Sequence, residues 1–576
     1  MNSADLPESS SNVPDLLPET PPDAELGRPS SRTDNIQVGV PKDVTKHLVT
    51  GTSALGAGIL VERGFGFLAN ILAARWGGAS TFGAYSLAIT TANNISTYAA
   101  GGIGATAARF SGKYPRGGPG YGTLARVLLI VSTVSASAAA VGLWIGAGPI
   151  AHLLGKGSLT GLLRWSAFSA AGIILLECAR GFFVGQRRLR ALLLLSVLVG
   201  AGMVVLLPSS AAHHSPVRMI VSQGAITTGA VLVCMLLARP LGLKDGNKNS
   251  RDSQRSDLAS ADAQEVGARG LRTLGRRLPV GPMLREVWTF GMVQLASLVG
   301  ANLAGWWLAS LVARSDTTLV QMGFFSIASQ LRNIVGLVPG LLTESSYSVM
   351  AERDGGEAAT PGRVMAMCTY ICSFLSLLLA GAGILVIPWG LTLLYGRTYT
   401  GAAVTTAFAL AIAVVHMGNS PTAARLTILS IRTTGLINTA WAVSVAVAAT
   451  VFLLHGGGAA EGMAIYLAAH ALSAALVLLA LSRRGNVPEG VTLTFLLTTG
   501  TAVLLSVLAA ARTRRPDLVL PISGLMLLIW AAALCALGIL GRRHGWLPDR
   551  KTLRRLIGAF QARISGMFGG HGRQTA

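Results

Sequence analysis

Charged residues are scarce in this sequence, and acidic ones most of all. Only 12% of the 576 residues are charged, 51% are hydrophobic, and the mean hydropathy is +0.55. An ordinary soluble domain carries about 25% charged residues, so this composition excludes a soluble globular protein and predicts a polytopic membrane protein. Lys and Arg outnumber Asp and Glu by 47 to 25. Because they gather in alternate loops, the positive-inside rule explains the excess, and no nucleic-acid partner is expected.

Cysteine is also rare, and the motifs of catalysis and metal binding are missing. The five cysteines lie within apolar segments and have no metal-ligand spacing with histidine, so we expect neither a metal site nor a cofactor. The sequence contains no nucleophile elbow, no HExxH and no Walker loop. It also lacks a large loop carrying His and Arg, which a membrane-embedded polysaccharide polymerase or ligase would need. We therefore expect a protein that is not an enzyme.

Fourteen apolar windows follow one another along the chain, each long enough to cross a bilayer. They predict an all-α polytopic membrane protein with about 14 transmembrane helices, in two six-helix pseudo-symmetric lobes plus two C-terminal helices. The expected order is a disordered cytoplasmic tail at 1–46, a first lobe at 47–240, a cytoplasmic linker at 241–284, a second lobe at 285–484, two additional helices at 485–541 and a basic amphipathic cytoplasmic tail at 542–576. Loop charge places both termini in the cytoplasm, with Arg512, Arg514 and Arg515 as exceptions.

The two lobes contain a repeated segment, which falls in the windows at 82–107 and 319–350. Six positions in the first copy have a counterpart 240 positions later: Phe82, Gly83, Tyr85, Ser86, Ala88 and Asn93 correspond to Met322, Gly323, Phe325, Ser326, Ala328 and Asn333. Six predicted crossings separate the copies, so both enter the membrane in the same direction. The sequence therefore predicts parallel repeats that are related by an axis along the membrane normal.

Two adjacent charges, Glu62 and Arg63, lie at the midpoint of the first apolar window. Each charge at that depth costs about 2.5 to 3.5 kcal/mol on insertion scales, so both side chains must face protein or water. Adjacent residues point about 100° apart on a helix and cannot pair with each other. Arg63 shares its helix face with Gly56 and Asn70. A salt bridge to a neighbouring helix and a charged cavity wall are the two interpretations of this pair.

Further polar residues lie at membrane depth in corresponding helices of the two halves. For a single Asn or Gln, a hydrogen bond between helices is the simpler explanation, and snorkelling explains Arg180 and Arg425. Their clustering, together with His416 and a kink predicted at Pro339, indicates an electropositive cavity between the lobes that binds an anion. The expected cavity residues are Arg63, Arg332, Arg180 and Arg425 for phosphate, Asn70, Asn93, Asn94, Gln294, Asn302, Gln330 and Asn333 for sugar, and Glu62 and Glu344 as candidates for ion coupling.

The segment LVERGFGFLANILAARWGGASTFGAYSLAITTANNISTYAAGGIGATAARF resembles the opening of polysaccharide flippases. These form the O-antigen and exopolysaccharide branch of the multidrug, oligosaccharidyl-lipid and polysaccharide flippase superfamily. The resemblance covers the first two helices in sequence, and the remainder by helix number and lobe symmetry; it does not extend to the N-terminal tail or the linker. It implies that undecaprenyl-pyrophosphate-linked repeat units are exported across a bacterial plasma (inner) membrane by alternating access. Lipid-linked oligosaccharide, membrane lipids and the polymerase and export machinery of the pathway are the implied partners.

Two other transport functions fit the same architecture. A lipid II flippase would share the cationic cavity and the helix number. A multidrug cation antiporter would need acidic residues within its lobes to bind cations, and only Glu62, Glu177 and Glu344 qualify, against a larger number of arginines. A membrane-embedded polymerase or ligase is a third alternative, from another functional class. The sequence specifies neither the glycan, nor the coupling ion, nor the oligomeric state.

Overall fold

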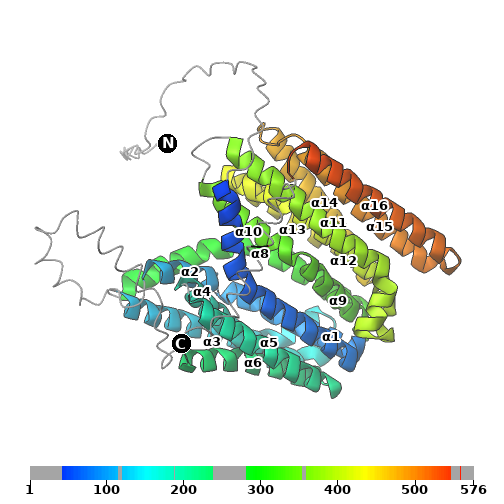
Figure 1. The fold of residues 1–576 in the computed structure, drawn as a ribbon. Coiled ribbons are helices and arrows are strands. Elements are labelled where there is room, and N and C mark those ends of the chain that lie inside the picture. Colours follow the sequence, from blue (N-terminus) through cyan, green and yellow to red (C-terminus); the bar gives the residue numbers. More distant parts are fainter. Residues whose placement is uncertain are drawn as a thin grey trace, which may run out of the picture. The chain divides into compact units, whose positions relative to one another are not determined.

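The computed structural model describes residues 42–100, 102–114, 120–186, 188–237, 280–352, 359–546 and 558. All regular structure in these ranges is helical, and they contain no strand (Figure 1). The helices are α1 (Lys42–Ala100), α2 (Ile103–Lys113), α3 (Tyr121–Leu153), α4 (Thr160–Gly185), α5 (Leu189–Ala212), α6 (Pro216–Leu237), α8 (Val280–Ser315), α9 (Val320–Val335), α10 (Leu337–Glu352), α11 (Ala359–Tyr395), α12 (Ala403–Leu429), α13 (Ile431–Leu453), α14 (Ala459–Ser482), α15 (Val491–Arg514) and α16 (Val519–Arg543). Three short 3-10 turns, η1 (Gly157–Leu159), η2 (Arg397–Ala402) and η3 (Pro516–Leu518), join some of them.

The described helices make this a polytopic α-helical membrane protein, as the composition predicted. Ten of them are long and apolar enough to cross a membrane, and the bent pair α9 and α10 would make an eleventh span. The number of fourteen crossings stays a prediction. Helix α1 contains the first predicted window and most of the second, joined at Gly78, whose positive φ of 75° interrupts the helical backbone. The second predicted helix is broken, since α1 ends at Ala100 and α2 begins at Ile103.

Two of the expected domain boundaries differ from the helix ends. Helix α1 already begins at Lys42, inside the range expected to be a tail, and α8 begins at Val280, inside the expected linker. Both helices begin with residues that precede the apolar window, and hydropathy alone does not fix the terminal turn of a helix. The rest of the N-terminal tail and of the linker lies outside the described residues. So does the basic C-terminal tail, apart from 542–546 and 558.

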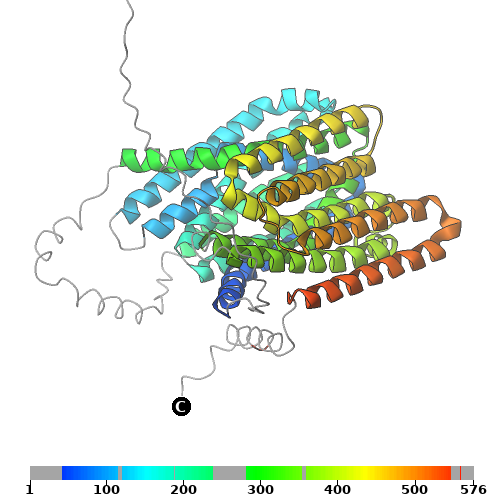
Figure 2. The same ribbon diagram turned by 90° about the horizontal axis from the view of Figure 1, so that it is seen from above.

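The helices pack in two groups. Helices α1 to α6 contact mainly one another and are called the first bundle, and α9 to α14 form most of the second bundle. Helix α8 contacts both groups: its first half packs on α2 and α3, and its second half packs on α13. Helices α15 and α16 pack on α11 and α12 at the edge of the second bundle, shown in orange to red in Figures 1 and 2.

The two bundles meet where the repeated segments cross. The Ser326 hydroxyl donates to the Ser86 hydroxyl at 2.8 Å, and these residues hold the same position in the two copies. A Cβ atom added to Gly83 would lie 2.0 Å from the Leu319 carbonyl oxygen, and one added to Gly323 would lie 2.3 Å from that of Ala79. Equivalent residues can contact one another only near a two-fold axis. The crossing therefore confirms the predicted repeat and its pseudo-symmetry.

Several further contacts join the bundles at the loop end of this crossing. Arg75 donates to the Leu393 carbonyl oxygen at 2.8 Å, and Lys156 donates to that of Asp316 at 2.6 Å. The hydroxyl of Ser80 donates to the Thr318 carbonyl oxygen. We call this set of contacts the closed end. At the other end of the helices, Lys113 of α2 pairs with Glu286 of α8 at 2.8 Å, between two half-exposed side chains.

Arg512, one of the exceptions to the loop-charge pattern, has a structural role. Pro388 lies inside α11 and has no N–H, so the carbonyl oxygen of Ile384 loses its helical partner. Arg512 of α15 is buried and donates to that oxygen at 3.2 Å and to the Leu385 carbonyl oxygen at 3.1 Å. A buried cation that satisfies backbone oxygens in a neighbouring helix is explained by packing, without reference to membrane orientation.

Candidate functional site

The charge at Glu62 is neutralised within the first bundle. Its carboxylate accepts a hydrogen bond from Arg180 of α4 and a second from the Ser196 hydroxyl of α5 at 3.3 Å. Arg180 also pairs with Glu177, one turn earlier on α4, at 2.6 Å. The salt-bridge interpretation of Glu62 is therefore confirmed. Arg180 was expected to bind phosphate, but its guanidinium is already balanced by two carboxylates.

Arg63, the neighbour of Glu62, is exposed on α1, and the structure places no ion pair or hydrogen bond on it among the described residues. Its helix face continues through Asn70 to Ala74, whose carbonyl oxygen accepts a hydrogen bond from Tyr399 of η2 at 3.4 Å. A guanidinium at this depth needs water or an anion as its partner.

The second half of α1 carries the predicted asparagines. Asn93 is exposed, whereas Asn94 is partly buried and bonds within its own helix, to the Thr90 carbonyl oxygen at 3.0 Å and to the Tyr98 hydroxyl at 3.2 Å. Next to them, Thr91 accepts a hydrogen bond from the indole of Trp306 on α8 at 3.1 Å. Neither residue of this contact between α1 and α8 was among the predicted site residues.

Asn93 and Asn333 extend the crossing of the two repeats. Each lies seven residues after one of the paired serines, Ser86 and Ser326, which is two turns along the same helix face and about 10 Å along the axis. Both asparagine side chains are exposed, whereas the serines are in contact. The two equivalent amides are therefore accessible beyond the serine pair.

Arg332 lies in the last turn of α9, next to Asn333. Its guanidinium is 5.3 Å from the ring centroid of Tyr466 on α14, and it donates weakly to the Asn333 amide oxygen at 3.4 Å. The chain bends by 51° between α9 and α10. The bend comes where Pro339, which has no N–H, leaves the Val335 carbonyl oxygen without a helical partner. It places Arg332 at a helix end.

Two histidines lie close to Arg332 inside the second bundle. The rings of His416 on α12 and His470 on α14 have centroids 5.1 Å apart. Tyr466 and Trp441 enclose His470, at 4.8 and 5.1 Å between centroids. The Trp441 indole N–H is buried without a hydrogen-bond partner. The sequence analysis named only His416; a lone His470 in an otherwise apolar window was the signal that could have added the second.

The remaining predicted residues are more dispersed. Arg425 is buried on α12, Glu344 is exposed on α10, and Asn70 and Asn302 are partly buried on α1 and α8. The Gln330 amide oxygen is buried and has no hydrogen-bond partner. The side chain of Gln294 lies outside the described residues. In the part of the chain that the structure describes, no group of His, Cys, Asp and Glu is suited to hold a metal ion.

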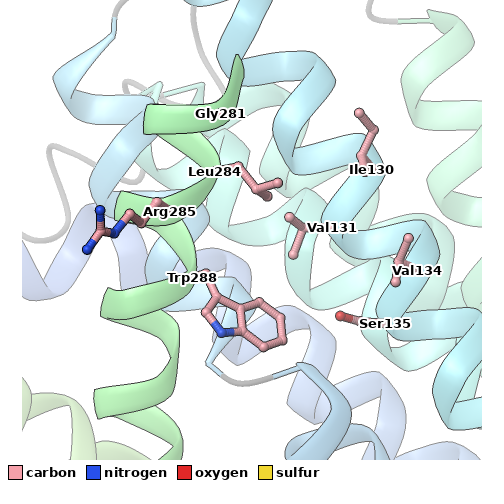
Figure 3. Close-up of a pocket in the computed structure, with 8 residues that line it drawn as sticks. All are labelled: Ile130, Val131, Val134, Ser135, Gly281, Leu284, Arg285 and Trp288. Atoms are coloured by element: carbon pink, nitrogen blue, oxygen red, sulfur yellow. The ribbon is translucent and has the colours of Figure 1, made fainter. Parts of the chain in front are cut away.

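An apolar pocket of about 420 Å³ lies between α3 and α8, shown in Figure 3. Leu284 and Trp288 point across it toward Val131 and Val134, while the guanidinium of Arg285 points away from α3. The complete lining is Ile130, Val131, Val134, Ser135, Gly281, Leu284, Arg285 and Trp288. With Ser135 as its only uncharged polar residue, this pocket suits a hydrocarbon chain better than a sugar.

The chain is similar in fold to known transporters. It matches the lipid II flippase MurJ in an inward closed conformation with a TM-score of 0.57 and 12% identity, over 85% of this chain and 99% of that one. It matches an inward-facing multidrug resistance MATE family transporter of the MOP superfamily with a TM-score of 0.55 and 14% identity, over 73% and 94%. A MOP superfamily transporter from Pyrococcus furiosus, described as having a binding pocket of reverse polarity, gives 0.50 and 13%, over 77% and 98%.

At sequence identities this low, the similarity shows that the chain shares the fold of these transporters and nothing further. No curated protein sequence matches the chain. The family model described as polysaccharide biosynthesis protein matches residues 48–352, which is more than half of the chain. The match includes both copies of the repeat, together with Arg63, Arg332 and the paired asparagines. The chain belongs to the polysaccharide biosynthesis protein family.

Proposed function

We propose that this protein is a flippase that moves an undecaprenyl-pyrophosphate-linked oligosaccharide across the bacterial plasma membrane. The observation that carries the proposal is a set of side chains at membrane depth in both halves: Arg63 and Arg332 have no carboxylate partner among the described residues, and the amides of Asn93 and Asn333 are exposed. Alternating access of the two bundles around these side chains would move the head group, with both termini in the cytoplasm and the closed end outside.

The chemistry of the substrate matches these side chains. Two ionised phosphates cannot cross hydrocarbon unaided, because an isolated charge there costs tens of kcal/mol by Born estimates. The planar guanidinium forms bidentate, charge-assisted hydrogen bonds with phosphate oxygens. Asparagine amides both donate and accept, as recognition of sugar hydroxyls requires. The apolar pocket between α3 and α8 offers a separate surface for hydrocarbon.

A multidrug cation antiporter is a poorer match to this site. Glu62, a predicted candidate for ion coupling, is engaged by Arg180 and Ser196, so its charge is already satisfied. Glu344 is exposed on α10 but lies in the helix that follows Arg332. A cationic drug at this site would therefore meet Arg63 and Arg332, which no carboxylate of the described residues balances.

The test is a flipping assay in proteoliposomes. A fluorescent undecaprenyl-pyrophosphate oligosaccharide is incorporated, and its transfer between leaflets is followed with a membrane-impermeant quencher. We expect Arg63→Ala and Arg332→Ala each to slow transfer by about tenfold or more, because hydrogen bonds to charged groups contribute about 1.5 to 3 kcal/mol. Arg63→Lys and Arg332→Lys should retain part of the rate.

Arg164→Ala is the matched control, since this arginine of α4 lies over Trp144 with its guanidinium 6.0 Å from the ring centroid. Unchanged transfer by both alanine variants of the site would contradict the proposal. Transfer of lipid II in place of the polymer repeat unit would assign the chain to the lipid II flippases, and transport of cationic drugs alone would assign it to the antiporters.

A further inference from the structure

The second bundle contains a group of cationic and titratable side chains that the proposed function does not use fully. His416 and His470 lie with their ring centroids 5.1 Å apart, on helices α12 and α14. The structure places no hydrogen-bond partner on either imidazole among the described residues. Arg332 of α9 reaches the same group through Tyr466, whose ring is 5.3 Å from the guanidinium and 4.8 Å from the His470 centroid.

Among the described residues, no carboxylate lies next to the two rings. The positive charge of Arg332 acts on both imidazoles, and His416 also acts on His470. Helix α14 adds the Tyr466 phenol, α13 adds the uncharged indole of Trp441, and α8 approaches the Tyr466 hydroxyl at Gly305. Helix α11 places the Ser373 hydroxyl against Gly418 of α12, two residues after His416. No carboxylate of the described residues contacts either imidazole.

A proton on either histidine would therefore add a positive charge that the protein does not balance. Three cations in a low-dielectric interior repel one another strongly. An anion with two negative charges removes that repulsion, and it also gains a hydrogen-bond donor from each protonated ring. Anion binding and protonation must then favour each other by thermodynamic linkage.

We propose that Arg332, His416 and His470 form a proton-linked binding site for a diphosphate diester, with Tyr466 and Trp441 as its aromatic wall. This inference rests on the proposed function for the identity of the carried lipid, whose head group is such a diester. The loaded site holds protons on the imidazoles, and the empty site releases them. His416 is an exposed residue of α12, which leaves a route by which an anion can reach the group.

The linkage can be measured on the purified protein with a soluble probe. P1,P2-dimethyl diphosphate is suitable, because its two ionised oxygens keep their charge while imidazoles titrate, between about pH 5 and 8. Calorimetric titration near neutral pH, in two buffers of different ionisation enthalpy, gives the number of protons taken up per ligand bound. For the wild type we expect proton uptake, and an affinity that falls as the pH rises, by up to roughly tenfold per pH unit for each linked proton.

Variants separate the roles of the side chains. His416→Gln together with His470→Gln should bind the probe without proton uptake and with a flat pH dependence, and Arg332→Ala should weaken binding at every pH. His455→Gln is the matched control, because that exposed histidine bonds only to its own helix, at the Val451 carbonyl oxygen. It should behave as the wild type.

Three results would overturn the inference: a wild-type protein that does not bind the probe, one that binds it without proton uptake, or a double-glutamine variant that keeps the uptake. The first two need no variant, so a misfolded mutant cannot rescue the proposal. Proton-linked binding in a protein that moves no glycolipid would leave the site standing and remove the proposed function. Glycolipid transfer without proton uptake would remove only the site.

Discussion

The crossing of the two repeats predicts that a single methyl group at Gly323 will open the closed end. A Cβ atom there would lie 2.3 Å from the Ala79 carbonyl oxygen. Even close carbon-to-oxygen contacts in proteins lie at about 3.3 Å, so Gly323→Ala requires α9 and α1 to move apart by about 1 Å. The clash involves backbone atoms, which cannot rotate away as a flexible side chain could.

The size of the effect follows from the cost of overpacking, which is typically about 1 to 3 kcal/mol. In a two-state transporter this cost falls only on the state in which the helices touch. A destabilisation of about 2 kcal/mol changes the ratio of closed to open molecules by roughly 30-fold. Gly83→Ala, with its Cβ atom 2.0 Å from the Leu319 carbonyl oxygen, should have the same effect from the other copy of the repeat.

Cross-linking measures the closed population directly. Ser86→Cys and Ser326→Cys are introduced into a background without the five native cysteines, because the two hydroxyl oxygens are 2.8 Å apart in the closed state. We expect mild oxidation to join this pair rapidly in the parent and several times more slowly after Gly323→Ala. Gly142→Ala is the control, since a Cβ atom there meets nothing within 4 Å. Equal cross-linking rates with and without Gly323→Ala would refute the argument.

Three further perturbations test the charges that hold the fold. Glu62→Gln should lower the unfolding temperature, measured by fluorescence-detected size exclusion, because Arg180 then keeps only Glu177 as a partner. Exchanging the two charges with Glu62→Arg and Arg180→Glu should restore part of the lost unfolding temperature. Arg512→Leu should cost about 1.5 to 3 kcal/mol of stability. Adding Pro388→Ala should recover part of that stability, because it returns an N–H to the Ile384 carbonyl oxygen, and thermal unfolding of the double variant checks this outcome. Burial raises the pKa of Asp316, but bonds from Gln321 and Thr318 outweigh it and lower that pKa overall. Its stabilising contribution is thus present above its unfolded pKa of about 3.9 and lost as the pH falls through the lower folded value, so Asp316→Asn should unfold earlier than the wild type near neutral pH but not in strong acid.

The sequence predicted the helices because hydropathy depends on neighbouring residues alone. Helices of the structure contain most residues of the predicted windows, and the repeat at an offset of 240 predicted the two-fold relation that the contact between Ser86 and Ser326 confirms. The break between Ala100 and Ile103 escaped prediction because small residues and glycines there continue an apolar run. The left-handed conformation of Gly102 ends that run in the structure.

Partners far apart in sequence could not be predicted in the same way. Glu62 and Arg180 are 118 residues apart, and the sequence favoured a cavity wall over a salt bridge for the charged pair. His416 and His470 belong to different helices, so no spacing rule joins them. Arg512 appeared as an exception to a charge pattern because its partners are backbone oxygens, which every sequence contains.

The charges at membrane depth are distributed unequally between two bundles that share a fold. In the first bundle, Arg180 is held between Glu62 and Glu177, so its charge is balanced by the protein. In the second bundle, Arg332 has imidazoles and a phenol around it and no carboxylate among the described residues. An anionic head group would therefore be attracted mainly by the second bundle. The symmetric amides Asn93 and Asn333 would instead contact its sugars from both sides. On this view the head group's negative charge, which no carboxylate of the described residues supplies next to Arg332, is what stabilises protons on His416 and His470, and an empty transporter returns without them.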